Sequence, residues 1–345
     1  VSSGTLTISG SGTLGANTNT LTVSSGTLNL GTTTQTINGG LTLSSSGTIS
    51  NGTLSSTATF NLQGGTVSAV LSGTGGVTSS SSTTTLSGAN TYSGNTTING
   101  GTLTVSGSGT LGANTNALTV TGSGTLNLGG TTQTANGLVT LGNSTISSGT
   151  IQSGTLSSST GYAVQNGTIS ATLTGAGGLT KSTAGSVTLS GANNYSGGIT
   201  VSAGTLTLSA ANSYTGNTTV TGGTLQISNS SAGTLGSTTN SLSVSAGTVN
   251  LGYTTQTING GLTLTGGTIQ NGTLSSTSTF DLQAGTISAT LAGLGSINKT
   301  TNGTVTLSGT NTYSGATTIS AGTILGGSTN SLSASSAFTI ASGAT

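Results

Sequence analysis

Very few residues in this chain of 345 could take part in acid–base or metal chemistry. It has two lysines, Lys181 and Lys299, one carboxylate, Asp281, and no histidine, cysteine, arginine or glutamate. General acid–base catalysis needs a group that titrates near the working pH, and a nucleophile needs a base beside it. One carboxylate supplies neither a catalytic triad nor a carboxylate pair. The composition therefore predicts a non-enzymatic protein without catalytic residues.

The same composition argues against cofactors and nucleic acid. Zinc sites need several Cys, His or carboxylate ligands, and calcium sites usually need several carboxylates, so we expect no metal site and no cofactor. A net charge of +1 cannot neutralise a phosphate backbone, which argues against nucleic acid as a partner. We expect no membrane insertion by this segment, because no apolar run is long enough to span a bilayer. Val1 begins inside a repeat and not in a signal peptide, which is typical of a mature product or a fragment.

Tyrosines are the remaining candidates for contact with a ligand. Near-copies of the motif LSGANTYSG contain Tyr92, Tyr195, Tyr214 and Tyr313. A strip of aromatic rings could stack on glycans. One tyrosine at a fixed place in each unit is also typical of a corner residue that packs on the preceding coil with its hydroxyl in water. Only Tyr195 and Tyr214 would be immediate neighbours, so we expect corner packing and no continuous strip.

Apolar residues alternate with small polar ones along most of the chain, as in TLNLG at residues 27–31 and TLTVS at 102–106. This period of two is typical of strands with one buried face. A flexible linker would lack apolar residues, whereas this chain is 30% hydrophobic and has a positive mean hydropathy. Proline is absent. Asn-Gly pairs at strand ends predict left-handed turns; they begin at Asn38, Asn99, Asn136 and Asn259.

Internal repeats define the architecture. The units LSGANNYSGGITVSAGTLT and LSAANSYTGNTTVTGGTLQ follow each other directly, so that Tyr195 and Tyr214 are separated by one repeat length. A unit of this size with two or three short strands matches one coil of a β-solenoid. The sequence thus predicts an all-β fold, a parallel β-helix (β-solenoid) of about 17–18 coils of roughly 19–20 residues each.

A longer period is superimposed on the coils. Two sets of equivalent residues follow it: Gln35, Gln133 and Gln256, and Phe60, Tyr162 and Phe280. We expect the glutamines to satisfy backbone groups at a turn and the aromatic residues to fill the core. The chain is predicted to be a single continuous β-solenoid over residues 1–345. Its super-repeats are expected at approximately 1–98, 99–220 and 221–320, with a partial repeat at 321–345.

The charged residues suggest one ion pair. The separation of Asp281 and Lys299 along the chain is close to the length of one coil, so we expect them to face each other across neighbouring turns. Such a surface pair contributes about 0–1 kcal/mol and indicates no function. Lys181 has Ala163 at the same offset and would lack this partner.

Threonine and asparagine patterns raise two further alternatives. Flat threonine arrays on solenoids can order ice, but they need a Thr pair on coil after coil. The Thr-x-Thr stretches at 34–36, 132–134 and 255–257 return about once per super-repeat, which argues against ice binding. Asn-x-Ser/Thr sequons occur at Asn95, Asn194 and Asn217, and they are glycan acceptors only where the host glycosylates exported proteins.

Three segments resemble the autotransporter-associated β-strand repeat, which is found in passenger domains of bacterial autotransporters and related surface proteins: Gly76–Ser106, Gly178–Ser209 and Gly295–Ile324. The last two share a lysine at one offset before the tyrosine, where the first has Ser or Thr. The resemblance implies a right-handed parallel β-helix that is exported across a Gram-negative envelope and displayed outside the cell.

Two functions fit these observations. The first is an extracellular structural protein at the outer surface of a bacterium, in which the solenoid forms or belongs to a cell-surface fibre or filament. Open strand edges and near-zero net charge favour self-association, end to end or laterally. The alternative is an autotransporter passenger adhesin, in which the rod is a stalk for binding to cell-surface glycans or another surface. No segment looks like a tip domain, so the structural role ranks first.

Overall fold

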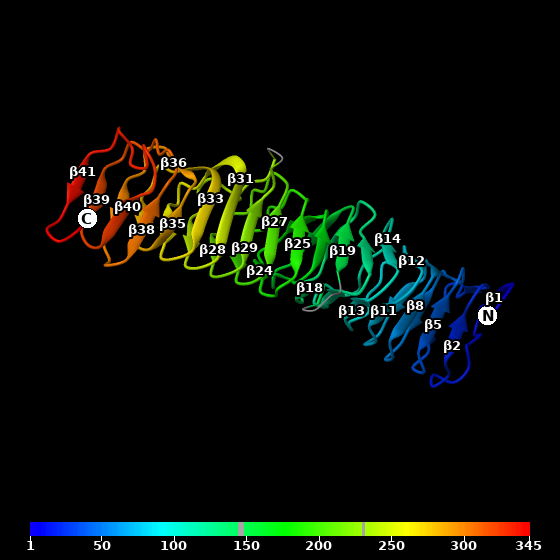
Figure 1. Cartoon of the computed structure of the whole chain (residues 1–345). Helices are drawn as coiled ribbons and strands as arrows, with labels where there is room; N and C mark the ends of the chain where they lie inside the picture. The colour runs from blue at the N-terminus through cyan, green and yellow to red at the C-terminus, as the bar shows by residue number, and fades with distance from the viewer. Residues whose placement is uncertain (144–147, 230–231) are drawn as a thin grey trace. The chain divides into compact units, whose positions relative to one another are not determined.

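The computed structural model describes residues 1–143, 148–229 and 232–345. The chain divides into two compact units, Val1–Ala176 and Gly177–Thr345, and each is a stack of coils with parallel strands (Figure 1). The described residues form strands and turns and no helix. The all-β parallel solenoid is therefore confirmed, and its total of about 17 turns agrees with the predicted number of coils. The single continuous solenoid over residues 1–345 and the super-repeat boundaries stay predictions.

Each coil adds one strand to a sheet that we call sheet A and one to a facing sheet, sheet B. In sheet A the middle residue of a strand points inward, as Leu28 does between Thr27 and Asn29. In sheet B the outer two point inward, as Leu41 and Leu43 do. Because side chains alternate between the two faces of a strand, the period of two in the sequence places aliphatic residues inside both sheets.

Unit 1 has the following strands. Sheet A consists of β1 (Thr5–Thr7), β3 (Thr27–Asn29), β6 (Thr48–Ser50), β9 (Gly65–Val67), β12 (Thr83–Leu86), β14 (Thr102–Val105), β16 (Thr125–Asn127), β19 (Gly149–Gln152) and β22 (Gly167–Ile169). Sheet B consists of β2 (Leu21–Val23), β5 (Leu41–Ser44), β8 (Phe60–Gln63), β11 (Val77–Ser79), β13 (Thr96–Ile98), β15 (Leu118–Val120), β18 (Val139–Leu141) and β21 (Tyr162–Val164). Two short third sheets consist of β4 (Thr34–Thr36), β7 (Thr53–Ser55) and β10 (Val70–Ser72), and of β17 (Thr132–Thr134), β20 (Thr155–Ser157) and β23 (Thr172–Thr174).

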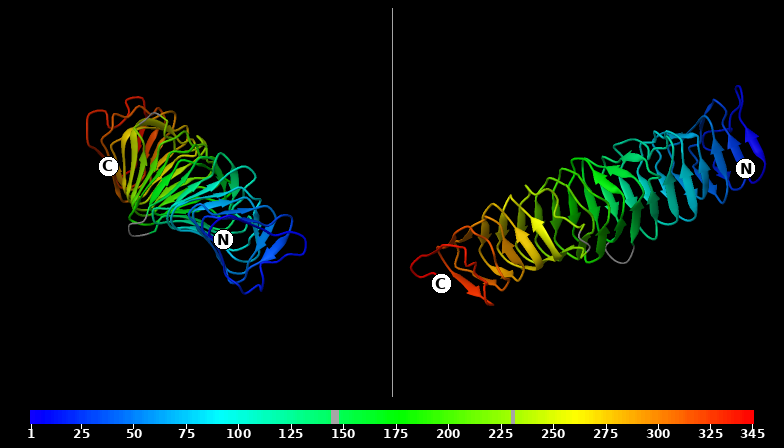
Figure 2. Two further views of the ribbon diagram at one scale, coloured as in Figure 1. Left: turned by 90° about the vertical axis from the view of Figure 1, so that its right-hand side faces the viewer. Right: turned by 90° about the horizontal axis from the view of Figure 1, so that it is seen from above.

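Unit 2 repeats this plan (Figure 2). Its sheet A consists of β25 (Ser186–Leu189), β27 (Thr205–Leu208), β29 (Thr224–Ile227), β31 (Thr248–Thr257), β33 (Thr268–Ser275), β35 (Gly285–Ile287), β38 (Thr304–Leu307) and β40 (Thr323–Gly326). Its sheet B consists of β24 (Leu179–Lys181), β26 (Ile199–Val201), β28 (Thr218–Val220), β30 (Leu242–Val244), β32 (Leu262–Leu264), β34 (Phe280–Leu282), β37 (Ile297–Lys299), β39 (Thr317–Ile319) and β41 (Phe338–Ile340). The long strands β31 and β33 continue past a register shift and pair on the third face, where β33 also pairs with β36 (Thr290–Ala292).

Coil length varies around the predicted value of roughly 19–20 residues. The coil that carries the chain from Phe60 to its strand partner Val77 is short, whereas the coil from Thr218 to its partner Leu242 is long. The strand register keeps inward-facing residues, most of them apolar, on inward-facing residues, since a slip of one residue would turn them outward. The connecting loops therefore absorb the differences in length.

The equivalent aromatic residues fill the core, as predicted. Phe60, Tyr162 and Phe280 are at most 1% exposed. Phe60 meets Tyr92 edge to face at 6.4 Å between ring centroids. The Tyr162 hydroxyl lies 2.8 Å from the Leu156 carbonyl oxygen and 2.7 Å from that of Thr174, so the one polar member of the set is satisfied inside the coil.

The left-handed turns lie one residue later than predicted. In the four Asn-Gly pairs named above, the glycines do not have positive φ angles; the next glycine does in three cases, with φ of 95° at Gly40, 61° at Gly101 and 91° at Gly261. The pair glycine is needed for a different reason. At Gly39, for example, a methyl group would overlap the carbonyl oxygens of the preceding coil, so only glycine allows this close approach.

Candidate functional site

The four motif tyrosines are core residues of the coils. Each is 0% exposed, so they form no strip for glycans, and the prediction that their hydroxyls reach water is wrong. On the third face of each coil the tyrosine ring points inward. For three of the four tyrosines, the residue four positions further on is the threonine that begins the next strand of sheet B. The hydroxyl pairs are Tyr92–Thr96 at 2.7 Å, Tyr214–Thr218 at 2.8 Å and Tyr313–Thr317 at 2.9 Å.

Tyr195 and Tyr214 are immediate neighbours, as predicted. Their rings stack with centroids 5.4 Å apart and an interplanar angle of 10°. Burial raises the pKa of Tyr92, Tyr162 and Tyr214 well above the ordinary tyrosine value, because the phenolate would lose its hydration inside the coil.

A buried asparagine two residues before the tyrosine joins neighbouring coils. The Leu71 amide donates to Asn90 Oδ1 (2.9 Å), and Asn90 Nδ2 donates to the Thr110 carbonyl oxygen (2.8 Å). The side-chain amide of Asn90 thus accepts a hydrogen bond from one neighbouring coil and donates one to the other, as a backbone peptide group does in a parallel strand. Sequence reasoning missed this role, although the fixed spacing to the tyrosine was visible. Asn212 and Asn311 make equivalent bonds to both adjacent coils.

Replacing Asn212 by leucine should lower the free energy of unfolding of unit 2 by about 2–4 kcal/mol, because the Asn193 amide and the Thr234 carbonyl lose a partner. The matched control is Asn194→Leu, in the same motif but exposed, which should change it by less than about 0.5 kcal/mol. Urea denaturation followed by circular dichroism measures both. Equal effects of the two exchanges would contradict the bridging role.

The three equivalent glutamines satisfy backbone groups of the preceding coil, as predicted. Gln256 accepts from the Leu235 amide (2.9 Å) and donates to the Gly233 carbonyl oxygen (3.0 Å). Its Nε2 also donates to Thr254 Oγ1 (2.7 Å). Gln35 and Gln133 make the same set of bonds.

Both lysines point into the coil, and the predicted surface pair is wrong. Lys181 and Lys299 are 0% exposed, and each Nζ donates to the carbonyl oxygen two residues further on. Asp281 lies opposite Asn298 because the local coil is shorter than the average, so Lys299 is one position further along and faces inward. Asp281 instead accepts from Gln283 Nε2. Burial lowers the pKa of both lysines.

The folded chain should resist trypsin, because its only two cleavage sites, Lys181 and Lys299, are buried in strands. Trypsin under native conditions is expected to leave the chain intact over a period in which the urea-unfolded chain is cut at both lysines. The variant Asn302→Lys places a lysine in an exposed loop and should be cut at that position. Rapid native cleavage at Lys181 and Lys299 would contradict the tightly stacked coils.

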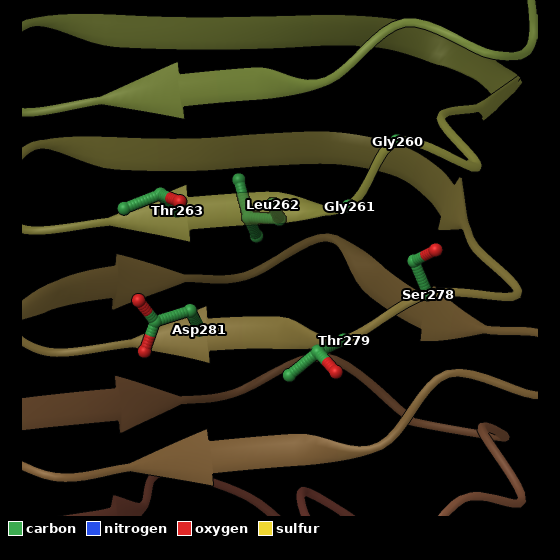
Figure 3. Close-up of a pocket in the computed structure, with 7 residues that line it drawn as sticks. All are labelled: Gly260, Gly261, Leu262, Thr263, Ser278, Thr279 and Asp281. Carbon is green, nitrogen blue, oxygen red and sulfur yellow. The ribbon is translucent and has the colours of Figure 1, made fainter.

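One shallow hollow in unit 2 contains the sole carboxylate (Figure 3). It is lined by Gly260, Gly261, Leu262, Thr263, Ser278, Thr279 and Asp281. Thr263 and Asp281 lie side by side on adjacent strands, β32 and β34. Among the described residues no group of three or more His, Cys, Asp or Glu could hold a metal ion. The hollow offers one carboxylate and several hydroxyls, and no second titratable group to form an acid–base pair.

The Thr-x-Thr stretches do not continue from coil to coil. The Thr34 and Thr36 pair of β4 is followed on the next coils by Thr53 and Ser55 and then by Val70 and Ser72. The third face therefore lacks the repeated Thr pair that ice binding would need.

The sequon residues Asn95, Asn194 and Asn217 are exposed.

Tyr253 is an exposed aromatic residue that sequence reasoning did not single out. It is 77% exposed and has a φ of 59°, in the left-handed region. The equivalent residues in the earlier repeats are Thr32 and Gly130, so no aromatic recurrence in the sequence marked this position.

Comparison with known families identifies the repeat. The family model described as passenger-associated-transport-repeat matches residues 79–105, 179–208, 203–227 and 297–325. Searches of curated proteins and of solved structures found no significant match. Among the described residues, no helix has the length and apolar character needed to cross a membrane. The chain is thus a β-solenoid in which four segments match the passenger-associated-transport repeat, and three of them confirm the resemblance to the autotransporter-associated β-strand repeat predicted from the sequence.

Proposed function

We propose that this protein is a non-enzymatic extracellular structural protein, whose β-solenoid forms or belongs to a cell-surface fibre. The observation that carries the proposal is that its most distinctive side chains link one coil to the next. Asn90, Gln256, Tyr214 and Lys181 are all buried and bonded or packed within the stack. Passenger-associated-transport repeats point to autotransporter passengers, which are surface-exposed or secreted, and this supports an extracellular location.

The first strand of unit 1 and the last strand of unit 2 have core-facing side chains that a neighbouring coil would cover. Leu6 in β1 is 43% exposed although it pairs with the core residue Leu28, and Phe338 and Ile340 in β41 are 46% and 56% exposed although they occupy core-facing positions. A further coil would cover these side chains and pair the free edges of the strands. In the fibre that we propose, that coil belongs to a second copy or to further repeats of the same chain.

The outer faces add little repulsion. Threonines follow one another on sheet A of unit 1 in consecutive coils: Thr5, Thr27, Thr48, Thr66, Thr85 and Thr104. The whole chain has a net charge of +1. Uncharged, β-compatible faces and near-zero net charge favour association of molecules over dispersion.

Electron microscopy and sedimentation of the 345-residue chain over a range of concentrations test the proposal. We expect filaments or oligomers that grow with concentration. The variant Ile340→Lys should weaken association by placing a charge at the core edge of β41, whereas Thr339→Lys, on the outer face, should change it little. Monodisperse monomers of the 345-residue chain at high concentration would overturn the proposal that copies of this chain associate into a fibre.

A passenger adhesin that binds cell-surface glycans is the second candidate. Its contacts cannot come from Tyr195 and Tyr214, which are buried, but the ring of Tyr253 is 77% exposed and could stack on a sugar. Saturable binding on a glycan array that is lost in Tyr253→Ala would favour the adhesin. Absence of binding, together with filaments, would favour the fibre.

A further inference from the structure

Two coils of unit 2 hold a lysine ammonium inside the corner that joins sheet B to sheet A. Lys181 ends β24, and the chain resumes in sheet A at Ser186. A methyl group on Gly204, in the next coil, would overlap the carbonyl oxygens of Thr183 and Gly185 and lie 2.6 Å from Lys181 Nζ. The second corner has the same arrangement, with Gly322, Thr301, Gly303 and Lys299 Nζ at 2.7 Å. The ammonium therefore sits where two loop carbonyl oxygens converge.

Unit 1 has the same corner without the lysine. Ser79 ends β11, and sheet A resumes at Thr83 after a loop that is one residue shorter. A methyl group on Gly101 would overlap the carbonyl oxygens of Ser81 and Ser82. The pair of converging oxygens is thus kept, although a serine stands where Lys181 and Lys299 stand in unit 2. The Ser82 carbonyl oxygen already accepts from the Thr102 amide (3.3 Å), but a carbonyl oxygen has two lone pairs, and a cation beside both oxygens would offset the repulsion between their dipoles.

Two buried hydroxyl groups belong to the same corner. Ser79 and Thr84 are both 0% exposed, and within the described residues neither Ser79 Oγ nor Thr84 Oγ1 has a hydrogen-bond partner. Thr84 takes the strand position that Val187 and Val305 have in the lysine coils. Where unit 2 has a lysine and a valine, unit 1 therefore has Ser79 and Thr84, and both bring a hydroxyl group to the inside of the coil. Buried hydroxyls without partners are costly, so their presence together points to a ligand.

We propose that this corner of unit 1 binds a monovalent cation, K⁺ or Na⁺. Its ligands are Ser79 Oγ, Thr84 Oγ1 and the carbonyl oxygens of Ser81 and Ser82. Neutral oxygen ligands suit a hard cation, and the absence of a carboxylate from this set disfavours Ca²⁺ and Mg²⁺, whose sites are built with carboxylates. The free cation replaces the positive charge that the lysine side chain brings to the equivalent corners of unit 2.

The melting temperature of the full chain in KCl, NaCl and choline chloride at equal ionic strength tests the site. We expect a saturable rise of roughly 2–4 °C in KCl or NaCl over choline chloride, because a ligand that binds only the folded state stabilises it. Choline is too large to enter the corner, so it controls for general salt effects. Equal melting temperatures in all three salts would overturn the proposal.

Variants at the corner separate specific binding from binding elsewhere. Ser79→Lys supplies the ammonium of the unit 2 corners and should remove the difference between the salts while keeping the stability that KCl gives the unmodified chain. The double variant Ser79→Ala, Thr84→Val should fold, by circular dichroism, and lose the salt difference. Thr78→Ala, on the outer face of β11, should keep it. A salt difference that survives in the double variant would overturn the assignment, even if the lysine variant fails to fold.

Discussion

Raising the pH above about 10 is expected to destabilise the protein steeply, because its buried tyrosines cannot ionise in the folded state. The pKa values of Tyr92, Tyr162 and Tyr214 are raised by desolvation. A raised pKa contributes stability that is fully present below the ordinary tyrosine value and is lost as the pH rises through the raised value. Each tyrosine then costs up to about 1.4 kcal/mol per pH unit, so the three together cost up to about 4 kcal/mol per unit.

The two lysines act in the opposite direction over a lower range. Their pKa values are lowered by burial, so the unfolded chain binds more protons than the folded one between the lowered values and the ordinary lysine value. Stability therefore rises slightly with pH in that window, and this gain ends at about pH 10.5. Above that pH only the tyrosine loss remains, because both lysines are then deprotonated in the folded and in the unfolded state.

Urea denaturation at about pH 7, 9, 10 and 11 measures this profile, and the phenolate absorbance reports when the tyrosines ionise. Tyr214→Phe removes one of the three groups and should reduce the slope above pH 10 by about a third. Tyr253→Phe makes the same exchange at an exposed ring and is the matched control for the substitution itself. A marked loss of stability between about pH 7 and 9, where no histidine is present to titrate, would contradict the explanation.

Replacing Tyr214 by alanine should lower the free energy of unfolding by about 3–5 kcal/mol, the range for removal of a large buried aromatic side chain. The ring is 0% exposed and stacks on Tyr195 at 5.4 Å, and its hydroxyl pairs with Thr218 Oγ1. The variant therefore loses core burial, a ring contact and a hydrogen bond in one coil.

The matched control is Tyr253→Ala, because it makes the same exchange in the same unit at a side chain that is 77% exposed. Its effect should stay within about 0.5 kcal/mol. Tyr214→Phe should cost about 1 kcal/mol, because it removes only the hydroxyl and leaves Thr218 Oγ1 without this partner. Urea denaturation of the three variants gives the comparison. A smaller loss for Tyr214→Ala than for Tyr253→Ala would contradict the core role.

The sequence predicted the fold well because the information is local. Alternation of apolar and polar residues sets which side of each strand faces inward, and the repeats set how the coils stack. The inward positions of Phe60, the turn role of Gln256 and the Tyr195–Tyr214 contact follow from these two rules alone. None of them depends on the length of a particular loop.

Polar residues inside the coils could not be placed in this way. Asp281 and Lys299 were paired by an average coil length, but the local coil is shorter, and an error of one residue moves a side chain to the opposite face. The role of Asn212 could not be predicted, because hydropathy does not show that a buried amide can replace a strand peptide. The corner at Ser79 depends on converging carbonyl groups, which leave no trace in the sequence.

The asparagine bridge has a consequence for how such a protein can change its length. The coil that contains Asn193 is a near-copy of the coil that contains Asn212, and the Asn193 amide bonds to Asn212 Oδ1. A newly duplicated coil therefore finds on its own parent the partners that its polar groups need. An in-frame duplication of one unit inserts without any compensating substitution, since each coil contacts only its neighbours. Genes of this kind can lengthen or shorten by whole coils through recombination between repeats, and the variants would fold.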